Sequence, residues 1–460
     1  MLTPNKTNTS LLRLQKTIFF LALFLVIPLW NIPHTIAGRY ICEGLLLITV
    51  LSYKPDWKEF FQKNKFLLVF FTYLFIQLIF FSQDFQIAFS NFRGEWMHFI
   101  LFSIIGAGVG LTLGKKDSSK LLLYLGIAFS IPLYIHLVLF LVKAISIGAI
   151  PWRYWGISEI HGDFGYPALE AIMLFFTYYL YQAKGRRERY LAICLMLICI
   201  ISPFLAESRG GTGFAIAGIF FIFIAHFFIG NTIKAGLYKK ILRLFIAIFL
   251  IVCTFQIGVM SDPTRWGGIL SRLSMGFQGN PSEVYCNGIE SLKDTLTSKG
   301  IIITPEIQKG LDSVVDGDGA RMMAARSGSM LALKNPMGID QSKQAYQQAI
   351  TTFCGGPPKI FISHAHDAWI DTALAIGIPG AMLLLLVLFQ YARLGYRALK
   401  DNSTAFPYGM ALFASACMWI LRGLLDSTMR DQMLEMQAFI FALLLGMIIS
   451  KAKSKPITLD

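Results

Sequence analysis

Two short stretches of the chain carry polar side chains whose types and spacing could perform chemistry. The first reads Ala206-Glu207-Ser208-Arg209-Gly210-Gly211, in which two ionisable residues precede two glycines. Glycine lets backbone or a ligand approach closely, and a guanidinium group at Arg209 could bind an anion through paired donors. The alternative is an arginine at the end of an apolar segment, whose charge simply extends into water.

The second stretch reads His364-Ala365-His366-Asp367-Ala368-Trp369, with Asp371 one helical turn after Asp367. An imidazole at His366 beside a carboxylate could accept a proton, with an ordinary pKa of about 6.5. The alternative is a histidine that only makes structural hydrogen bonds. Two histidines this close, without further ordered ligands, and 7 cysteines in no zinc pattern lead us to expect neither a metal nor a cofactor.

Other charged residues have competing interpretations. Arg153 lies between aromatic residues in Pro151-Trp152-Arg153-Tyr154-Trp155, which is typical of a membrane-interface belt and also of a sugar-stacking surface. Arg321 and Arg326 open a predicted helix, and for Arg326 we favour a solvated surface charge. The spacing of Arg422, Asp426 and Arg430 predicts a ladder of ion pairs on one helix face.

Composition identifies the environment in which these residues must work. The chain has 460 residues, of which 55% are hydrophobic and only 15% are charged, whereas soluble globular proteins are about 25% charged. The apolar residues are gathered into blocks of about 17–25, the length that spans a bilayer. This excludes a cytosolic enzyme, a nucleic-acid-binding protein and a secreted domain. The net charge of +14 therefore reflects membrane topology rather than a nucleic-acid partner.

The pattern predicts an all-α integral membrane protein with about twelve transmembrane helices. The expected spans are residues 17–31, 35–53, 66–82, 96–114, 121–142, 165–183, 190–206, 212–230, 241–258, 368–391, 405–424 and 433–450. The first is similar to a signal peptide, but we interpret it as a retained span. Lys and Arg concentrate in alternate connections, which places both termini on the cytoplasmic side.

One long external segment separates two groups of spans. We expect residues 1–258 to hold spans 1–9, residues 259–367 to form the external loop, and residues 368–460 to hold spans 10–12 and a cytoplasmic tail. The loop is rich in Gly, Asp, Ser and Thr. It contains predicted helices around 289–299, 304–315 and 320–333. Its length suits a lid or docking surface over the membrane-embedded part.

The chain resembles the bacterial lipopolysaccharide O-antigen ligases and the related O-antigen polymerases. Three motifs carry the resemblance: Ser208-Arg209-Gly210, Arg321 fifteen positions before the proline of Asn335-Pro336-Met337-Gly338, and His366 eleven positions before Gly377. The chain departs from the family at Asp367, where members usually have Asn. The motifs cover about residues 200–392, and the rest of the chain matches only in its expected topology.

The resemblance implies a metal-independent, inverting glycosyltransferase in the bacterial inner membrane. Such an enzyme transfers O-antigen glycan from undecaprenyl diphosphate to lipid A–core oligosaccharide at the periplasmic face. Arg209 and Arg321 would bind the donor diphosphate, and His366 would be the general base. The residues Asp367, Asp371, Glu207, Arg153 and His364 would support this site, with either aspartate orienting the His366 ring or holding the acceptor sugar. The expected partners are the two glycolipid substrates and membrane lipids.

Three functions remain open from sequence. A polymerase, or a protein O-glycan ligase of the same superfamily, would use the same donor with another acceptor. A transporter is suggested by the span count, but transporters often have two related halves with a mid-membrane site. No such halves are evident here, and the polar residues collect at the outer ends of spans.

Cys286 and Cys354 are the two cysteines in the expected periplasmic loop. Because the periplasm is oxidising, we predict a disulfide between them. The alternative is two free thiols that never meet.

Overall fold

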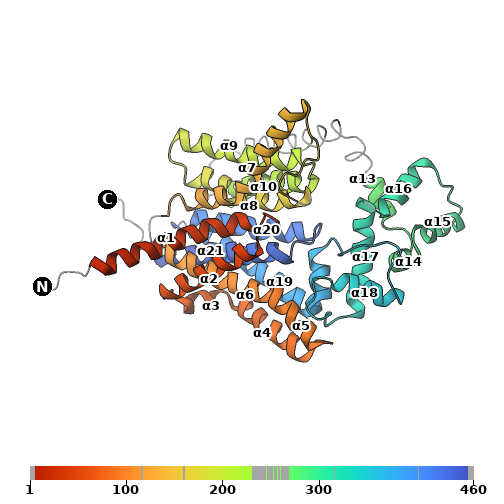
Figure 1. Ribbon diagram of the computed structural model, residues 1–460, viewed down its shortest axis with the longest axis horizontal. Helices are drawn as coiled ribbons and strands as arrows, with labels where there is room; N and C mark the ends of the chain where they lie inside the picture. Colours follow the sequence, from red (N-terminus) through yellow and green to blue (C-terminus); the bar gives the residue numbers. More distant parts are fainter. Residues whose placement is uncertain are drawn as a thin grey trace.

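The computed structural model describes residues 6–115, 118–158, 161–229, 269–315, 317–401 and 404–453, with four isolated positions at 245, 252, 256 and 260. Every regular element in these ranges is a helix, so the prediction of an all-α chain is confirmed for them (Figure 1). Most of the expected ninth span (241–258), including Cys253, lies outside the described residues, as do 259, 261–268 and 454–460.

The helices before residue 230 form one part of a bundle, which the three C-terminal helices complete (Figure 1). The N-terminal elements are α1 (Lys6–Leu29), α2 (Ile36–Ser52), α3 (Trp57–Lys63), α4 (Lys65–Phe80), α5 (Phe85–Asn91), the π-helix η1 (Phe92–Trp96), α6 (Met97–Leu113), α7 (Leu121–Ile147), the 3-10 helix η2 (His161–Phe164), α8 (Gly165–Tyr181), α9 (Arg186–Leu205) and α10 (Arg209–Ile229). The C-terminal helices are α19 (Ala368–Lys400), α20 (Phe406–Gly423) and α21 (Asp431–Lys453).

Among the described residues, 6 helices are long and apolar enough to cross a membrane. These are Phe85–Leu113, Leu121–Ile147, Arg186–Leu205, Arg209–Phe228, Ala368–Lys400 and Asp431–Lys453. The number becomes 7 if α2 and α3, bent by 110° at their junction, form one broken span. This arrangement is that of a multi-pass membrane protein.

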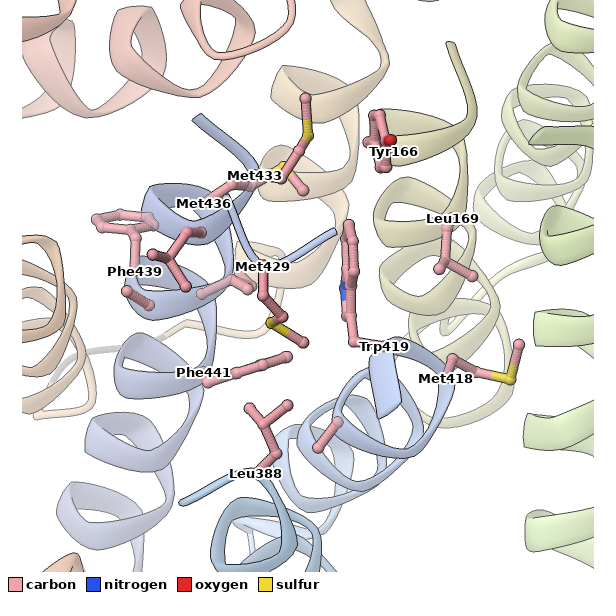
Figure 2. Close-up of a cluster of buried hydrophobic side chains, with 14 of the residues drawn as sticks. Tyr166, Leu169, Leu388, Met418, Trp419, Met429, Met433, Met436, Phe439 and Phe441 are labelled. Carbon is pink, nitrogen blue, oxygen red and sulfur yellow. The ribbon is translucent and has the colours of Figure 1, made fainter. Parts of the chain in front are cut away.

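The centre of the bundle is α21, whose apolar stretch is completely buried. It lies against α6, and glycines on both helices bring the two backbones into contact. A Cβ on Gly110 would lie 2.1 Å from the Leu443 carbonyl oxygen, and one on Gly446 would lie 2.7 Å from the Ala107 carbonyl oxygen. Small residues permit this close packing of membrane helices. Figure 2 shows the adjacent core, in which aromatic and methionine side chains of α8, α20 and α21 surround Trp419.

A separate group of short helices lies beside the bundle, at the right of Figure 1. It consists of α13 (Ile269–Met275), α14 (Pro281–Asn287), α15 (Ile289–Ser298), α16 (Pro305–Val315), α17 (Asp318–Lys334) and α18 (Ala345–Cys354). We call this the α13–α18 segment. The sequence correctly predicted α15, α16 and α17 to within two residues at each end. It missed α13, α14 and α18, which have only 7, 7 and 10 residues.

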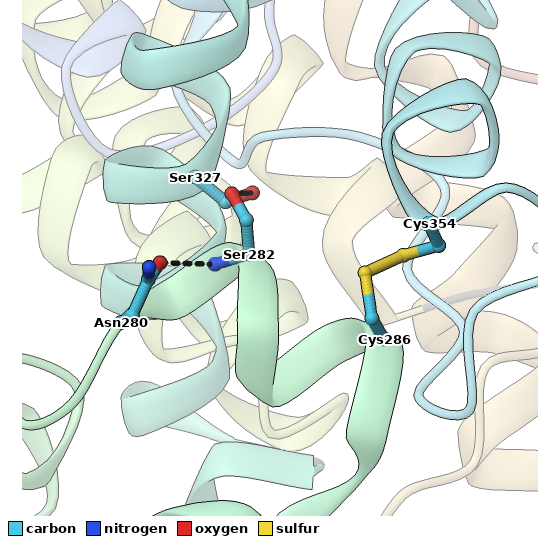
Figure 3. The surroundings of a disulfide bond; sticks show 5 residues. All are labelled: Asn280, Ser282, Cys286, Ser327 and Cys354. Carbon is cyan, nitrogen blue, oxygen red and sulfur yellow. Dashed lines mark hydrogen bonds between the residues drawn. A yellow bond between two sulfur atoms is a disulfide. The ribbon is translucent and has the colours of Figure 1, made fainter.

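A disulfide joins Cys286, at the end of α14, to Cys354, the last residue of α18 (Figure 3). It links positions 68 residues apart, with the two Cα atoms 5.3 Å from each other. Asn280 caps α14 by accepting a hydrogen bond from the Ser282 amide at 3.2 Å. The disulfide therefore connects α14, near the start of the α13–α18 segment, to the end of α18, and α17 lies between the two in sequence.

The first prediction concerns this disulfide. Thiol labelling of denatured, unreduced protein should modify the free cysteines Cys42, Cys194, Cys199 and Cys417, and should spare the disulfide pair Cys286 and Cys354. Replacing both with serine should lower the free energy of unfolding by about 4 kcal/mol, because a long loop is then no longer closed in the unfolded chain. Labelling of Cys286 before reduction would contradict the bond.

Candidate functional site

A cavity of about 760 Å³ lies between the α13–α18 segment and the connecting loops of the helical bundle. It brings together side chains that are far apart in sequence. Its charged and titratable lining residues are Arg153, Arg209, Arg272, Asp318, Arg321, His364 and His366. Five of these were expected from sequence, and Arg272 and Asp318 were not.

Arg209 is positioned by the junction between α9 and α10. The chain reverses after Pro203, with Glu207 in the left-handed region at φ 55°, and α10 begins at Arg209. The Ser208 side chain accepts a hydrogen bond from the Gly211 amide at 3.2 Å, which secures the first turn. A Cβ on Gly211 would lie 2.9 Å from the Gly165 Cα, whereas one on Gly210 would meet nothing within 4 Å. Only the second glycine is therefore required for close packing.

Arg209 and Arg272 bind the same carboxylate. Arg209 donates from Nη2 to Asp318 Oδ1 at 2.9 Å and from Nη1 to Oδ2 at 3.3 Å. Arg272, on α13, donates from Nε to Asp318 Oδ2 at 3.0 Å. Burial alone would raise the pKa of Asp318, but its hydrogen bonds and charge interactions with the two guanidinium groups hold the pKa below its ordinary value. Asp318 is therefore an anion at neutral pH.

Arg153 reaches the cavity from the loop between α7 and η2. Its Nε donates to Glu207 Oε2 at 2.6 Å. Both residues have positive φ, 62° and 55°, a conformation that costs free energy for residues other than glycine and is concentrated at functional sites. Glu207 thus holds Arg153 at the mouth of the cavity, and Glu207 itself is not part of the lining.

Arg321 lies on α17, three positions after Asp318, with its side chain exposed in the cavity. Within the part of the chain that the structure describes, the Arg321 guanidinium group makes neither a hydrogen bond nor an ion pair. Its charge acts at longer range, because it lowers the pKa of both histidines of the cavity. A guanidinium group in this state can receive an incoming anion without first breaking an existing pair.

His364 and His366 lie side by side at the same cavity, with ring centroids 4.1 Å apart. His364 Nδ1 is 2.6 Å from the Ser363 hydroxyl oxygen. Burial, followed by the charges of His364 and Arg321, lowers the pKa of His366 to about 3. Burial, followed by the charge of Arg430, lowers the pKa of His364 to about 4. Both rings are neutral at physiological pH, and the expected pKa near 6.5 is wrong for the free protein because these groups are desolvated.

The two aspartates near His366 bind backbone rather than the imidazole ring. Asp367 is the N-cap of α19, and its Oδ1 accepts hydrogen bonds from the amides of Trp369 at 2.9 Å and Ile370 at 3.0 Å. Asp371 accepts from the Ala365 amide at 2.8 Å and from the Ser427 hydroxyl. The expectation that either orients the ring is not met. Because Asn and Asp are about equally good N-caps, Asp367 can perform the same local role as Asn.

A turn after α17 interlocks with a break in α19. Gly377 interrupts α19 with φ 83°, and Gly338 has φ 85°. The Ile378 amide donates to the Pro336 carbonyl at 2.9 Å, and the Ile339 amide donates to the Leu374 carbonyl at 2.8 Å. A Cβ on Gly338 would lie 2.4 Å from the Gly377 amide nitrogen. The two motifs identified in the sequence therefore form one contact, which we call the glycine lock.

The body of α17 also packs directly on the histidine turn. A Cβ on Gly328 would lie 2.9 Å from the Ala365 Cβ and 2.7 Å from the Ile370 Cγ2. The helix that carries Arg321 at its start thus contacts the residue between the two histidines. Together with the glycine lock, this fixes Arg321 relative to His366.

Arg326 is not the solvated charge that the sequence favoured. Its Nη1 donates to the Gly276 carbonyl at 2.8 Å, and its Nη2 donates to the Gly279 carbonyl at 3.0 Å. It therefore holds the connection between α13 and α14, outside the cavity lining.

The ladder expected from Arg422, Asp426 and Arg430 does not form, because α20 ends at Gly423. Arg422 is 3.5 Å from Asp426, but Arg430 pairs with Asp431 at 3.2 Å. Arg422 is buried with its guanidinium 4.0 Å from the Tyr166 ring centroid, and it donates to the Gly165 carbonyl at 2.6 Å.

The described residues contain no group of three or more His, Cys, Asp or Glu side chains that could hold a metal ion. Comparison with models of protein families found no match, and no curated protein matches the chain.

The second prediction concerns the glycine lock. Replacing Gly338 or Gly377 with alanine should lower the free energy of unfolding by about 2 kcal/mol or more, because the residue must keep a positive φ and its Cβ meets backbone atoms. Gly356→Ala is the matched control, since its Cβ would meet nothing within 4 Å. Thermal unfolding of the purified proteins in detergent gives the measurement. An unchanged apparent Tm for Gly377→Ala would show that the contact is dispensable.

Proposed function

We propose that this protein is a membrane glycosyltransferase of the O-antigen ligase type. In this proposal it transfers a glycan from undecaprenyl diphosphate to lipid A–core oligosaccharide. The observation that carries the proposal is the cavity that gathers Arg209, Arg321 and His366. Each of these residues comes from a different motif: Arg209 and Arg321 are 112 positions apart in sequence, and Arg321 and His366 are 45 positions apart. Nothing in their local sequence requires them to meet.

The arginines suit a diphosphate leaving group. Guanidinium groups offer paired, permanently charged donors that match phosphate oxygens without a metal ion. As the bond between the anomeric carbon and the diphosphate oxygen breaks, negative charge grows on that oxygen. Arg209 from the bundle and Arg321 from α17 would stabilise this charge from two sides.

His366 suits the other half of the reaction. An acceptor hydroxyl oxygen would attack the anomeric carbon and lose its proton to the imidazole, while undecaprenyl diphosphate departs. This direct displacement inverts the anomeric centre. In the free protein His366 is a weak base, because burial and positive neighbours lower its pKa to about 3. Diphosphate bound at Arg321 would offset that positive charge, so the base would strengthen when the donor is present.

The same proposal accounts for the membrane arrangement. About twelve spans with both termini cytoplasmic would place the α13–α18 segment and the cavity on the periplasmic side of the bacterial inner membrane. The Lys and Arg distribution supports this orientation. The Cys286–Cys354 disulfide supports an oxidising compartment for the segment.

A polymerase or a protein O-glycan ligase would use the same donor chemistry, so the acceptor decides between them. Purified protein should be supplied with lipid-linked glycan and, separately, with lipid A–core oligosaccharide, a second lipid-linked repeat unit or an acceptor protein. Product on lipid A–core alone supports the ligase. Product only on another acceptor would reassign the enzyme within the same reaction class, and no product with any acceptor would refute the transferase.

The third prediction tests the arginines. Arg209→Ala and Arg321→Ala should each lower transfer about 100-fold or more, because charge-stabilising donors are lost from the transition state. Lysine should restore little activity, since a point charge does not reproduce the planar fork. The control is Arg326→Lys, on the same helix as Arg321 but outside the cavity. Full activity with lysine at both positions would mean that charge alone matters.

The fourth prediction tests the base. His366→Ala should lower transfer by about 10²–10⁴-fold, the usual contribution of a general base, and should leave donor binding intact. His364→Gln should have a smaller effect. Because the pKa of His366 is about 3, its base form already dominates at pH 5 and above, so kcat/KM should not rise through pH 6.5 on its account. Turnover like that of the wild type in His366→Ala would contradict the assignment of His366 as the general base. Loss of turnover only in His364→Gln would do the same.

A further inference from the structure

One carboxylate in the cavity, that of Asp318, is bound by two arginines. The Asp318 carboxylate oxygens lie 2.9 and 3.3 Å from the two Nη atoms of Arg209. They lie 3.0 Å from both the Nε and the Nη2 atoms of Arg272. Paired N–H groups bind carboxylate and phosphate oxygens with the same fork geometry. Asp318 therefore occupies a position built for an anion.

This contact is shielded from solvent. The side chains of Arg209, Arg272 and Asp318 are 23%, 19% and 12% exposed. Ion pairs removed from water are weakened less by salt than exposed pairs. The two guanidinium groups also keep Asp318 ionised, as its lowered pKa indicates. A diphosphate that uses the fork of Arg209 must consequently compete with a charged internal group.

The position of Asp318 on α17 makes such an exchange feasible. It is the first residue of the helix and follows Gly317, and no side chain caps this helix terminus. Rotation of the Asp318 side chain would withdraw the carboxylate without moving Arg321, one turn further along. The arginines would then present their donors to a new anion while the rest of the cavity stays in place.

We propose that Arg272 is a third guanidinium that binds the donor diphosphate, and that Asp318 is an internal anion which occupies this position in the free protein and leaves it when the donor binds. The proposal rests on the proposed function, because it refines how the same donor is held. It gives Asp318 a role in setting affinity: an anion must bind strongly enough to replace a carboxylate already in place. A diphosphate, with more charge and more oxygens, meets that condition better than a monophosphate.

The test measures binding of undecaprenyl diphosphate to the purified full-length protein, without any transfer reaction. Asp318→Asn should bind about tenfold more tightly than the wild type if the open state is populated at about one part in ten. Arg272→Lys should bind more weakly. The control is Asp312→Asn, which removes a charge from neighbouring α16, where the carboxylate accepts a hydrogen bond from Gln308 at 2.9 Å. Undecaprenyl monophosphate should gain the same factor as the diphosphate from Asp318→Asn, because the cost of displacing the carboxylate is the same for both ligands.

The outcomes separate the two proposals. If the wild type binds and Asp318→Asn binds equally or more weakly, Asp318 is a fixed scaffold and the exchange is refuted. If Arg272→Lys binds as well as the wild type, the third guanidinium is refuted. If no form of the protein binds undecaprenyl diphosphate, the proposed function itself fails.

A second measurement uses the unaltered protein, in case Asp318→Asn does not fold. Carbodiimide labelling of carboxylates, read by mass spectrometry, should increase at Asp318 when undecaprenyl diphosphate is added, because the side chain leaves its arginine partners. Labelling at Asp312 should not change. Unchanged or reduced labelling at Asp318, with ligand binding demonstrated in the same sample, would overturn the exchange.

Discussion

The backbone hydrogen bonds of the glycine lock determine where the rest of the site lies. A helix break leaves carbonyl and amide groups without partners, and such groups are costly when buried. At Gly377 the turn containing Pro336 and Gly338 supplies those partners, and Tyr73 donates to the carbonyl of buried Ile376 at 2.7 Å. The α13–α18 segment is thereby attached to a membrane helix through main-chain bonds, which fix orientation more firmly than side-chain contacts between flexible groups.

The glycine lock also determines the positions of the site residues carried by α17 and by the start of α19. The α17 helix has 17 residues and is about 25 Å long at 1.5 Å per residue. Its last residue, Lys334, lies next to the glycine lock, and its first turn carries Asp318 and Arg321. On the α19 side of the lock, one short helical stretch separates Gly377 from His366. Arg321 and His366 therefore belong to one rigid unit, braced where Gly328 meets Ala365. Arg209 reaches the cavity from a different support, in which buried Arg422 holds the Gly165 carbonyl and Gly165 packs on Gly211.

Sequence predicted the elements better than it predicted the contacts. The apolar blocks located the helices, because burial in lipid demands long runs of one residue class. The resemblance carried by the motifs at Arg321, Pro336–Gly338, His366 and Gly377 indicated that these residues belong together, but not that Gly338 and Gly377 touch. Arg272 and Asp318 escaped notice because their pairing spans 46 positions and neither lies in an unusual local pattern. Arg326 and Arg430 were misjudged because a side chain's partner depends on which backbone lies beside it, and α20 ends earlier than helical periodicity implied.

The positive-φ residues at the cavity connect its geometry to its electrostatics. Arg153, Glu207 and His366 all adopt a conformation that is unfavourable for their types, and each sits where the chain turns sharply toward the cavity. The surrounding contacts sustain these strained turns, which bring charged and titratable side chains close together in a partly dehydrated space. There burial, together with the charges of His364 and the nearby arginines, lowers the pKa of His366. In the proposed function, a bound phosphate-bearing ligand would offset the positive charge and so strengthen the base. A catalyst assembled in this way would hold its base inactive toward water and activate it only when the leaving group is bound.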